Sequence, residues 1–180
     1  DREVEAELAA PATRPREDPG EAVRALVDPR AGGHRVAGVA LAGGVDPARV
    51  QLHPRCSQPD YLHLMQQIDI ALDPFPFNGH TTTCDALWQG VPVVSLVGDR
   101  YASRFGSSAM QMLGLEDLTT SSPAEYIEVA AHLAGDLERL GQIRTSLRDR
   151  MLASPLLDAR GFARNVEATY RRMWQHWCSG

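Results

Sequence analysis

The sequence predicts an α/β fold in which a parallel sheet is covered by helices on both faces. Two short apolar segments, residues 69–73 and 92–97, have the length and composition of buried strands. Segments with helical features alternate with them, and the connections are long enough for crossovers between parallel strands. In such sheets ligands bind outside the carboxyl ends of the strands, so we expect the functional site in the loops that follow them.

Residues 1–43 differ in composition from the rest of the chain. Their first part combines charged residues and alanine with several prolines, and a Gly-Gly pair follows. Because this composition buries little apolar surface, we expect residues 1–43 to be a weakly ordered or divergent flank, with short helical turns at 21–27 and 35–42. Residues 44–180 form the predicted folded domain, which includes the helices at its C-terminal end.

Regular elements follow one another from residue 44 onward. The expected order is strand 50–52, helix 60–67, strand 69–73, helix 81–89, strand 92–97, helix 104–113, a helix from Pro123, and helices 137–153 and 158–178. Pro123 suits the first position of a helix, and Ser122 before it is a favoured N-cap. The last helix carries an apolar stripe formed by Phe162, Val166, Tyr170, Met173 and Trp177. This stripe either covers the domain's own sheet or contacts another part of the protein.

Composition and charge exclude several classes of function. The 180 residues contain 18 basic side chains, all of them arginine, against 23 acidic ones, and this net charge of −5 argues against a nucleic-acid-binding protein. The three cysteines are far apart, which argues against a disulfide framework or a zinc cluster and predicts a reducing, cytoplasmic location. The longest apolar run, 91–97, is too short to span a membrane.

The pattern that points to chemistry lies between residues 69 and 90. A predicted strand ends at Asp73, and three threonines open the helix that follows Gly79. The first amides of a helix lack intrahelical partners and carry the positive end of its dipole, so they can bind a phosphate. His80 can donate a hydrogen bond to an anionic oxygen, and Asp85, one turn into the helix, can accept one from a ribose hydroxyl.

The residues by themselves leave a plainer interpretation open. A threonine before a helix is often only an N-cap, and an acid in the first turn often only complements the dipole. Cys84 is expected to be a small core residue rather than a nucleophile, and Arg104, after the second strand, to be solvated or paired. No spacing indicates a Ser-His-Asp triad or a pair of catalytic carboxylates, so the catalytic residues stay unassigned.

The run DIALDPFPFNGHTTTCDALWQGVPVVSLVGDRYASRFGSS, residues 69–108, closely resembles the C-terminal catalytic half of the O-linked N-acetylglucosamine transferase/SPINDLY family of glycosyltransferases. The similarity starts near Gly44 and ends in the helix around 170–174. It implies a two-lobed GT-B glycosyltransferase, of which this chain is the Rossmann-like, donor-binding C-terminal lobe. It also implies transfer of N-acetylglucosamine from UDP-N-acetylglucosamine to Ser or Thr hydroxyls of a protein acceptor, without a cofactor or an essential metal.

The resemblance assigns donor-binding roles to individual residues. The diphosphate is expected at Gly79, His80, Thr81 and Thr82, and the ribose at Asp85. The donors at the start of the helix add Thr83 to the expected diphosphate site. Tyr61 occupies a position where the family commonly has a histidine against the nucleotide. The tyrosine either stacks on uracil or ribose or is an ordinary half-buried helix residue.

Two departures from the family pattern bear on activity. The chain contains no lysine, whereas family members use an upstream lysine to neutralise the diphosphate. Neither the N-terminal lobe nor the tetratricopeptide repeats of the family are found in this sequence, so we expect the isolated chain to bind the donor but to transfer sugar poorly or not at all. Two other functions stay open: use of GDP-fucose, as in the SPINDLY branch, and a catalytically silent nucleotide-binding or interaction module.

Overall fold

The computed structural model describes residues 25–27, 46, 49–51, 53–54, 56–73 and 75–180. Their centre is a four-stranded sheet in the order β1-β2-β3-β4, and each neighbouring pair is parallel. The strands are β1 (Ala25–Val27), β2 (Ile70–Asp73), β3 (Val93–Leu96) and β4 (Thr119–Thr120). The predicted α/β fold with a parallel sheet is therefore confirmed.

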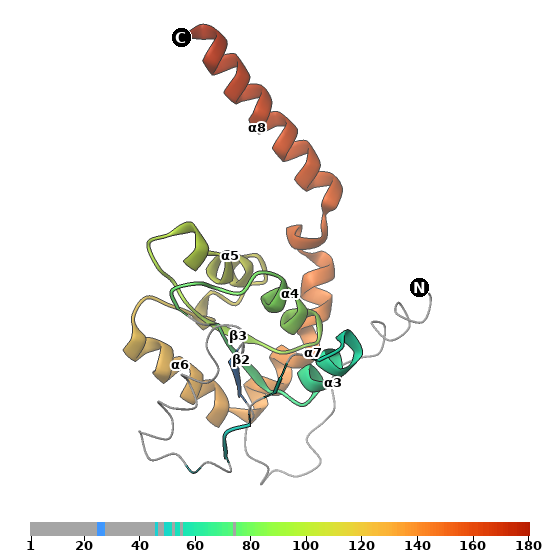
Figure 1. Cartoon of the computed structure of the whole chain (residues 1–180), viewed down its shortest axis with the longest axis vertical. Coiled ribbons are helices and arrows are strands. Elements are labelled where there is room, and N and C mark those ends of the chain that lie inside the picture. The colour runs from blue at the N-terminus through green and yellow to red at the C-terminus, as the bar shows by residue number, and fades with distance from the viewer. Residues whose placement is uncertain (1–24, 28–45, 47–48, 52, 55, 74) are drawn as a thin grey trace.

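Helices cover the sheet from both sides (Figure 1). Helices α4 (Thr81–Trp88) and α5 (Phe105–Met112) lie on one side, and α6 (Pro123–Gly135) lies on the other. Every residue of β3 is buried, as expected for a central strand with helices on both faces. Helix α7 (Leu137–Ala153) contacts both α4 and α6, and α3 (Gln58–Gln66) precedes β2.

Local sequence signals explain where several helices begin and end. Helix α6 starts at Pro123, and the Ser122 hydroxyl accepts from the Glu125 N–H at 3.2 Å, as the sequence predicts. Helix α5 ends before Gly114, whose φ of 65° suits a glycine. Helix α7 spans the predicted residues and turns one apolar face into the core; its buried residues are Leu140, Ile143, Leu147 and Met151.

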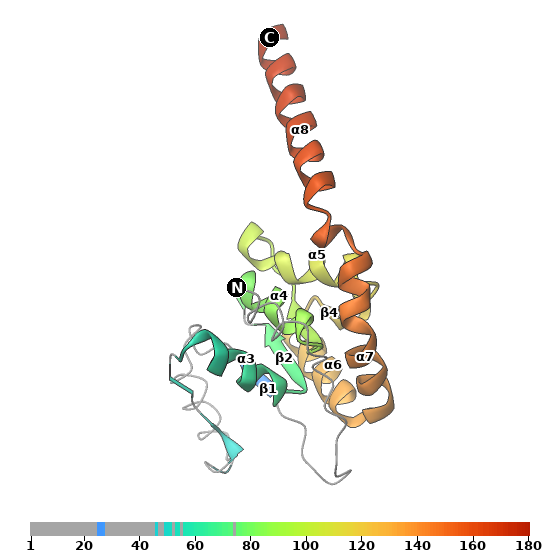
Figure 2. The same ribbon diagram turned by 90° about the vertical axis from the view of Figure 1, so that its right-hand side faces the viewer.

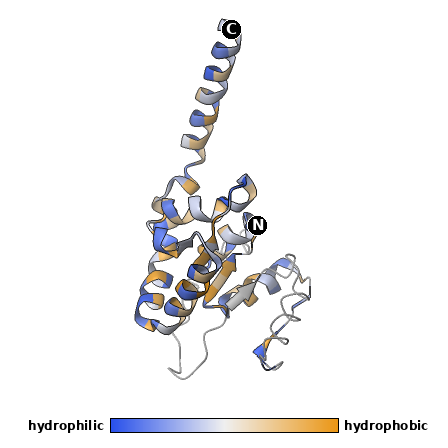
Figure 3. Ribbon diagram, turned by 90° about the vertical axis from the view of Figure 1, so that its left-hand side faces the viewer, coloured by the Kyte–Doolittle hydropathy of each residue, from blue (hydrophilic) through white to orange (hydrophobic). Residues whose placement is uncertain are grey.

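Helix α8 (Ala159–Ser179) projects away from the rest of the molecule (Figures 1 and 2). None of its residues is buried, and Trp177 is 76% exposed. Figure 3 shows hydrophobic and hydrophilic residues side by side along this helix. The predicted stripe therefore does not cover the domain's own sheet, and that alternative is wrong.

Two predictions near the N-terminus need correction. Residues Ala25–Val27 are not a helical turn but the strand β1, which pairs with β2. The predicted flank 1–43 thus contributes a strand to the sheet. Val50 and Gln51 carry no regular secondary structure in place of the expected strand, while Leu52 and the expected turn at 35–42 lie outside the described residues.

Candidate functional site

The predicted diphosphate-binding segment, residues 79–83, lies beyond the carboxyl end of β2, beside the loop that follows β3. The loop from Phe75 to His80 connects β2 with α4, and the loop from Val97 to Arg104 connects β3 with α5. The two loops meet, because the Asn78 N–H donates to the Ala102 carbonyl at 2.8 Å. The site therefore has the position expected for a ligand site in a parallel sheet.

Asp73, the last residue of β2, organises this edge of the sheet. Its side chain is buried, at 3% exposed, and both carboxylate oxygens accept hydrogen bonds. Oδ1 accepts from the Gly79 N–H at 2.7 Å, and Oδ2 accepts from the Ser95 hydroxyl at 2.8 Å. Hydrogen bonds to an ionised carboxylate are stronger than hydrogen bonds between neutral groups. The sequence showed an acid at the end of a strand but did not reveal that role.

Tyr126 of α6 reaches the same strand from the opposite face of the sheet. Its hydroxyl donates to the Asp73 carbonyl at 3.3 Å. Burial, and then the negative charge of Asp73, raise the pKa of Tyr126. The phenol therefore stays protonated at neutral pH and keeps its hydrogen bond.

The turn at Gly79 is closed by internal hydrogen bonds on both sides. The Gly79 N–H donates to Asp73, and the Gly79 carbonyl accepts from the Thr83 hydroxyl at 2.9 Å. A Cβ at this position would lie 2.5 Å from the Thr82 hydroxyl oxygen and 2.8 Å from that of Thr83, so the turn requires a glycine. Gly79 thus shapes the site, and its amide is already used within the protein.

The amides that remain for an anion belong to the first turn of α4. The first bond along this helix runs from the Cys84 N–H to the His80 carbonyl at 3.0 Å, so the amides of Thr81, Thr82 and Thr83 precede the intrahelical ladder. The N-cap residue, His80, makes no side-chain capping bond. The N-terminus of α4 therefore offers N–H donors and the positive end of a helix dipole.

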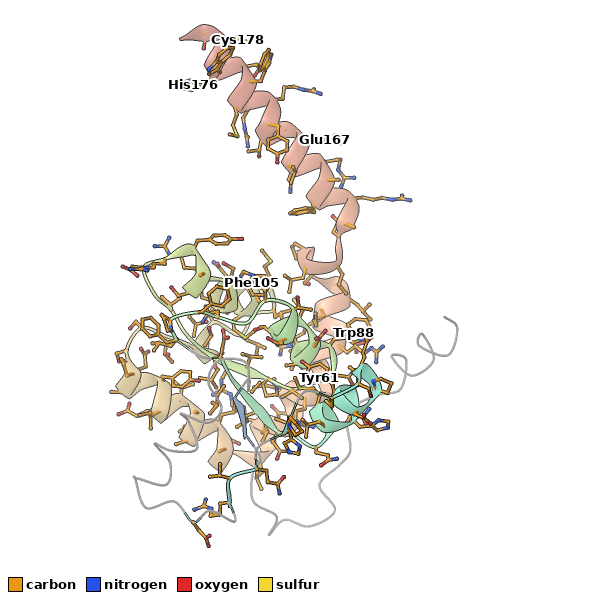
Figure 4. The ribbon with its side chains drawn as sticks, in the orientation of Figure 1. Tyr61, Trp88, Phe105, Glu167, His176 and Cys178 are labelled. Carbon is orange, nitrogen blue, oxygen red and sulfur yellow. The ribbon has the colours of Figure 1, made fainter. Side chains whose placement is uncertain are left out.

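Aromatic side chains hold the His80 ring beside these amides. Its ring centroid lies 4.6 Å from that of Phe105, 6.1 Å from that of Phe77 and 6.2 Å from that of Tyr101. Figure 4 labels Phe105 on α5, above the carboxyl ends of the strands. The His80 Nε2 atom is buried and has no hydrogen-bond partner among the described residues. Since a buried nitrogen without a partner is costly, this atom is suited to meet a ligand oxygen.

Asp85 and Cys84 lie further along α4. Asp85 is half-buried and follows Thr81 and Thr82 at helical spacings of four and three residues, which places it on their side of the helix. Burial, and then the charge of Asp85, raise the pKa of the Cys84 thiol. A raised pKa keeps the thiol protonated, in agreement with the prediction that Cys84 is no nucleophile.

Tyr61 lies on α3 and packs against the hydrophobic core. Figure 4 shows its side chain well apart from Phe105, toward Trp88 near the end of α4. Its contact with a nucleotide stays a prediction.

Arg104 has the structural role that the sequence favoured. Its guanidinium donates to the Gly98 carbonyl at 3.3 Å and to the Asp99 carbonyl, and so closes the loop after β3. A Cβ at Gly98 would lie 2.3 Å from the Ser103 hydroxyl oxygen, so this loop also depends on a glycine.

In the described part of the chain, no helix combines the length and hydropathy needed to cross a bilayer.

Comparison with known proteins identifies relatives along most of the chain. Glycosyl transferase family 41 matches residues 17–166, starting within the predicted flank. The chain is 42% identical over 138 residues to the "Probable UDP-N-acetylglucosamine--peptide N-acetylglucosaminyltransferase SPINDLY" of Solanum lycopersicum and 41% identical to the protein of the same name from Petunia hybrida. Each alignment covers 76% of this chain and 15% of the relative.

A solved structure shows the same fold. It is a K341M mutant of the Thermobaculum terrenum O-GlcNAc transferase, with a TM-score of 0.74 and 36% sequence identity. The match covers 82% of this chain and 28% of that chain, so the chain spans a minor part of the proteins that it resembles. The fold is thus the Rossmann-like lobe of a GT-B glycosyltransferase. The chain belongs to glycosyl transferase family 41.

Proposed function

We propose that this chain is the donor-binding part of a protein O-glycosyltransferase that transfers N-acetylglucosamine from UDP-N-acetylglucosamine to Ser or Thr hydroxyls. The observation that carries the proposal is the buried His80 Nε2, which has no hydrogen-bond partner in the described part of the chain and lies beside the first turn of α4. The relatives from Solanum lycopersicum and Petunia hybrida are named as probable peptide N-acetylglucosaminyltransferases, which supports this sugar and a protein acceptor.

The chemistry of the site suits a diphosphate leaving group. When the bond between sugar and phosphate breaks, negative charge grows on the diphosphate. Donors that are fixed in advance lower the barrier most, because they need not reorganise during the reaction. The amides of Thr81, Thr82 and Thr83 supply such donors, His80 adds a side-chain hydrogen bond, and Asp85 accepts from the ribose. This mechanism requires neither a metal nor an organic cofactor.

Several partners of the whole protein are also proposals. A second, N-terminal lobe would supply most of the acceptor site, and tetratricopeptide repeats in the parent protein would bind the polypeptide. Without that lobe the isolated chain would bind UDP but transfer sugar slowly or not at all. Three free cysteines support a reducing, cytoplasmic location.

Titration calorimetry with UDP tests the proposal. The wild-type chain should bind UDP, and His80→Ala should weaken the affinity by about 1–3 kcal/mol, the range for hydrogen bonds to charged groups. His132→Ala is the matched control, because His132 is exposed on α6 and should leave the affinity unchanged. If His80→Ala binds UDP as tightly as the wild type does, His80 does not contact the nucleotide.

The same titration with GDP distinguishes the other functions. Preference for UDP supports N-acetylglucosamine transfer, and preference for GDP indicates a fucosyl donor. Absence of binding to either nucleotide by a folded chain favours an interaction module and contradicts the proposed function.

A further inference from the structure

We infer that Asp73 is the positioning residue of the donor site: its buried carboxylate fixes the Gly79 turn and thereby directs the first turn of α4 and the His80 ring toward the diphosphate. This inference rests on the proposed function, since it concerns how the same site is held in place. The proposed role of Asp73 is exerted through Gly79 and does not require contact with the donor.

The geometry of the carboxylate is the first support. Its two oxygens accept from groups on two different segments, the backbone of Gly79 and the side chain of Ser95. The bond to Gly79 fixes the peptide plane before that glycine, and the bond from Thr83 to the Gly79 carbonyl fixes the plane after it. The two peptide groups on either side of Gly79 are therefore both fixed by hydrogen bonds, and they determine the direction in which α4 begins.

The packing of α5 is the second support. A Cβ at Gly106 would lie 2.4 Å from Asp73 Oδ2 and 2.1 Å from the Ser95 hydroxyl oxygen, so α5 lies directly against this pair. The residue before Gly106 is Phe105, whose ring contacts His80. The Asp73 carboxylate thus contacts both the Gly79 turn and α5, the helix that carries Phe105 against the His80 ring.

The negative charge of Asp73 needs a reason in a site for an anion. A buried carboxylate repels a nearby diphosphate, and its burial is costly unless it is well hydrogen-bonded. A carboxylate suits this position if holding the turn in place strengthens binding by more than the repulsion weakens it. The two effects predict opposite changes in UDP affinity when residue 73 is made neutral. Loss of the repulsion alone would make the variant bind UDP more tightly, whereas loss of positioning would make it bind UDP more weakly.

Three variants, each measured by UDP calorimetry and by circular dichroism, test the inference. Asp73→Ala removes both acceptors, and its UDP affinity should fall by about ten- to a hundredfold. Asp73→Asn keeps one acceptor for the Gly79 N–H and a donor for Ser95, so its affinity should lie between those of Asp73→Ala and the wild type. The control is Asp136→Ala, which removes a carboxylate that accepts from the Arg139 N–H at 2.9 Å at the start of α7. It should not change UDP affinity.

The Gly79 amide proton gives a readout that a general loss of stability would not move. In a ¹H–¹⁵N spectrum of the wild-type chain its resonance should lie downfield, because it donates to an ionised carboxylate. In Asp73→Ala the resonance should shift upfield while amides of α8 keep their positions, and Asp73→Asn should restore part of the shift.

The outcomes separate the inference from the proposed function. A wild-type chain that binds no UDP contradicts both. A wild-type chain that binds UDP while Asp73→Ala binds equally well contradicts the inference alone. If Asp73→Ala loses the native circular dichroism spectrum, the Asp73→Asn variant decides. Weaker UDP binding than that of the wild type, together with a shifted Gly79 amide resonance, supports the positioning role. Equal or tighter UDP binding contradicts it.

Discussion

Two helical glycines differ sharply in the space around them. At Gly106 an added Cβ would lie 2.1 Å from the Ser95 hydroxyl oxygen, whereas at Gly141 nothing lies within 4 Å. Gly106→Ala should therefore destabilise the fold by about 1–3 kcal/mol through overpacking. Gly141→Ala should stabilise it by up to about 1 kcal/mol, because alanine favours the helix. Urea denaturation of both variants measures the difference, and equal effects would mean that α5 does not pack against β3 as described.

Individual site residues were predictable to different degrees. His80 and the threonines of α4 could be proposed as donor ligands from the sequence, because a helix N-terminus can bind an anion, and their contact with the donor stays a prediction. Asp73 and Ser95 could not be assigned, because they are 22 residues apart and only the pairing of β2 with β3 brings them together. The role of Gly79 was predicted only in part: its amide serves the turn rather than a ligand.

At the scale of elements, the start of α6 should respond to pH. The Glu125 carboxylate accepts from the Ser121 N–H at 2.8 Å and from the Ser121 hydroxyl at 3.0 Å, and these bonds lower the pKa of Glu125. A carboxyl group with a lowered pKa stabilises the fold above its ordinary value of 4.5, and this contribution is lost as the pH falls through the folded-state pKa.

Glu125→Gln tests this dependence. Between about pH 6 and pH 3, the free energy of unfolding should fall more steeply for the wild type than for this variant. Glu128→Gln is the control, because it removes an acid from the same helix and leaves the bonds between Glu125 and Ser121 in place. Parallel profiles for Glu125→Gln and the wild type would show that the Ser121 bonds do not form in solution.

Helix α8 should contribute little to the stability of this chain. Trp177 is 76% exposed and stacks only on its neighbour Trp174 among the ring contacts described, whereas Leu147 of α7 is fully buried. Trp177→Ala should change the free energy of unfolding by less than about 0.5 kcal/mol. Leu147→Ala should lower it by about 2–5 kcal/mol. A large loss for Trp177→Ala in thermal denaturation would show that α8 packs on the domain in solution.

At the scale of the whole molecule, Arg144 joins the last part of the chain to the sheet. Its guanidinium, on α7, donates to the Ile68 carbonyl at 2.7 Å and to the Asp69 carbonyl at 3.2 Å, just before β2. Its side chain is only 10% exposed. Arg144→Met should lower the free energy of unfolding by about 1.5–3 kcal/mol, because partly buried carbonyls lose a charged donor.

Arg139→Met is the control for that prediction. Arg139 lies on the same helix and pairs with Asp117, but both side chains are more exposed, at 38% and 51%. Its loss should cost about 1 kcal/mol or less, as for surface ion pairs. Chemical denaturation compares the two, and an equal loss in both would contradict the link between α7 and the start of β2.

The α/β class, the parallel sheet, the bounds of most helices and the family could all be predicted before the structure was known. These follow from local signals: apolar runs of strand length, proline and serine at helix starts, and a contiguous motif from Asn78 to Trp88. Three features became visible only in the folded chain: Ala25–Val27 is a strand, α8 projects away from the domain, and Asp73 holds the Gly79 turn. Each of these depends on contacts between segments distant in the chain, and no local pattern encodes which distant partner supplies a hydrogen bond or a packing surface.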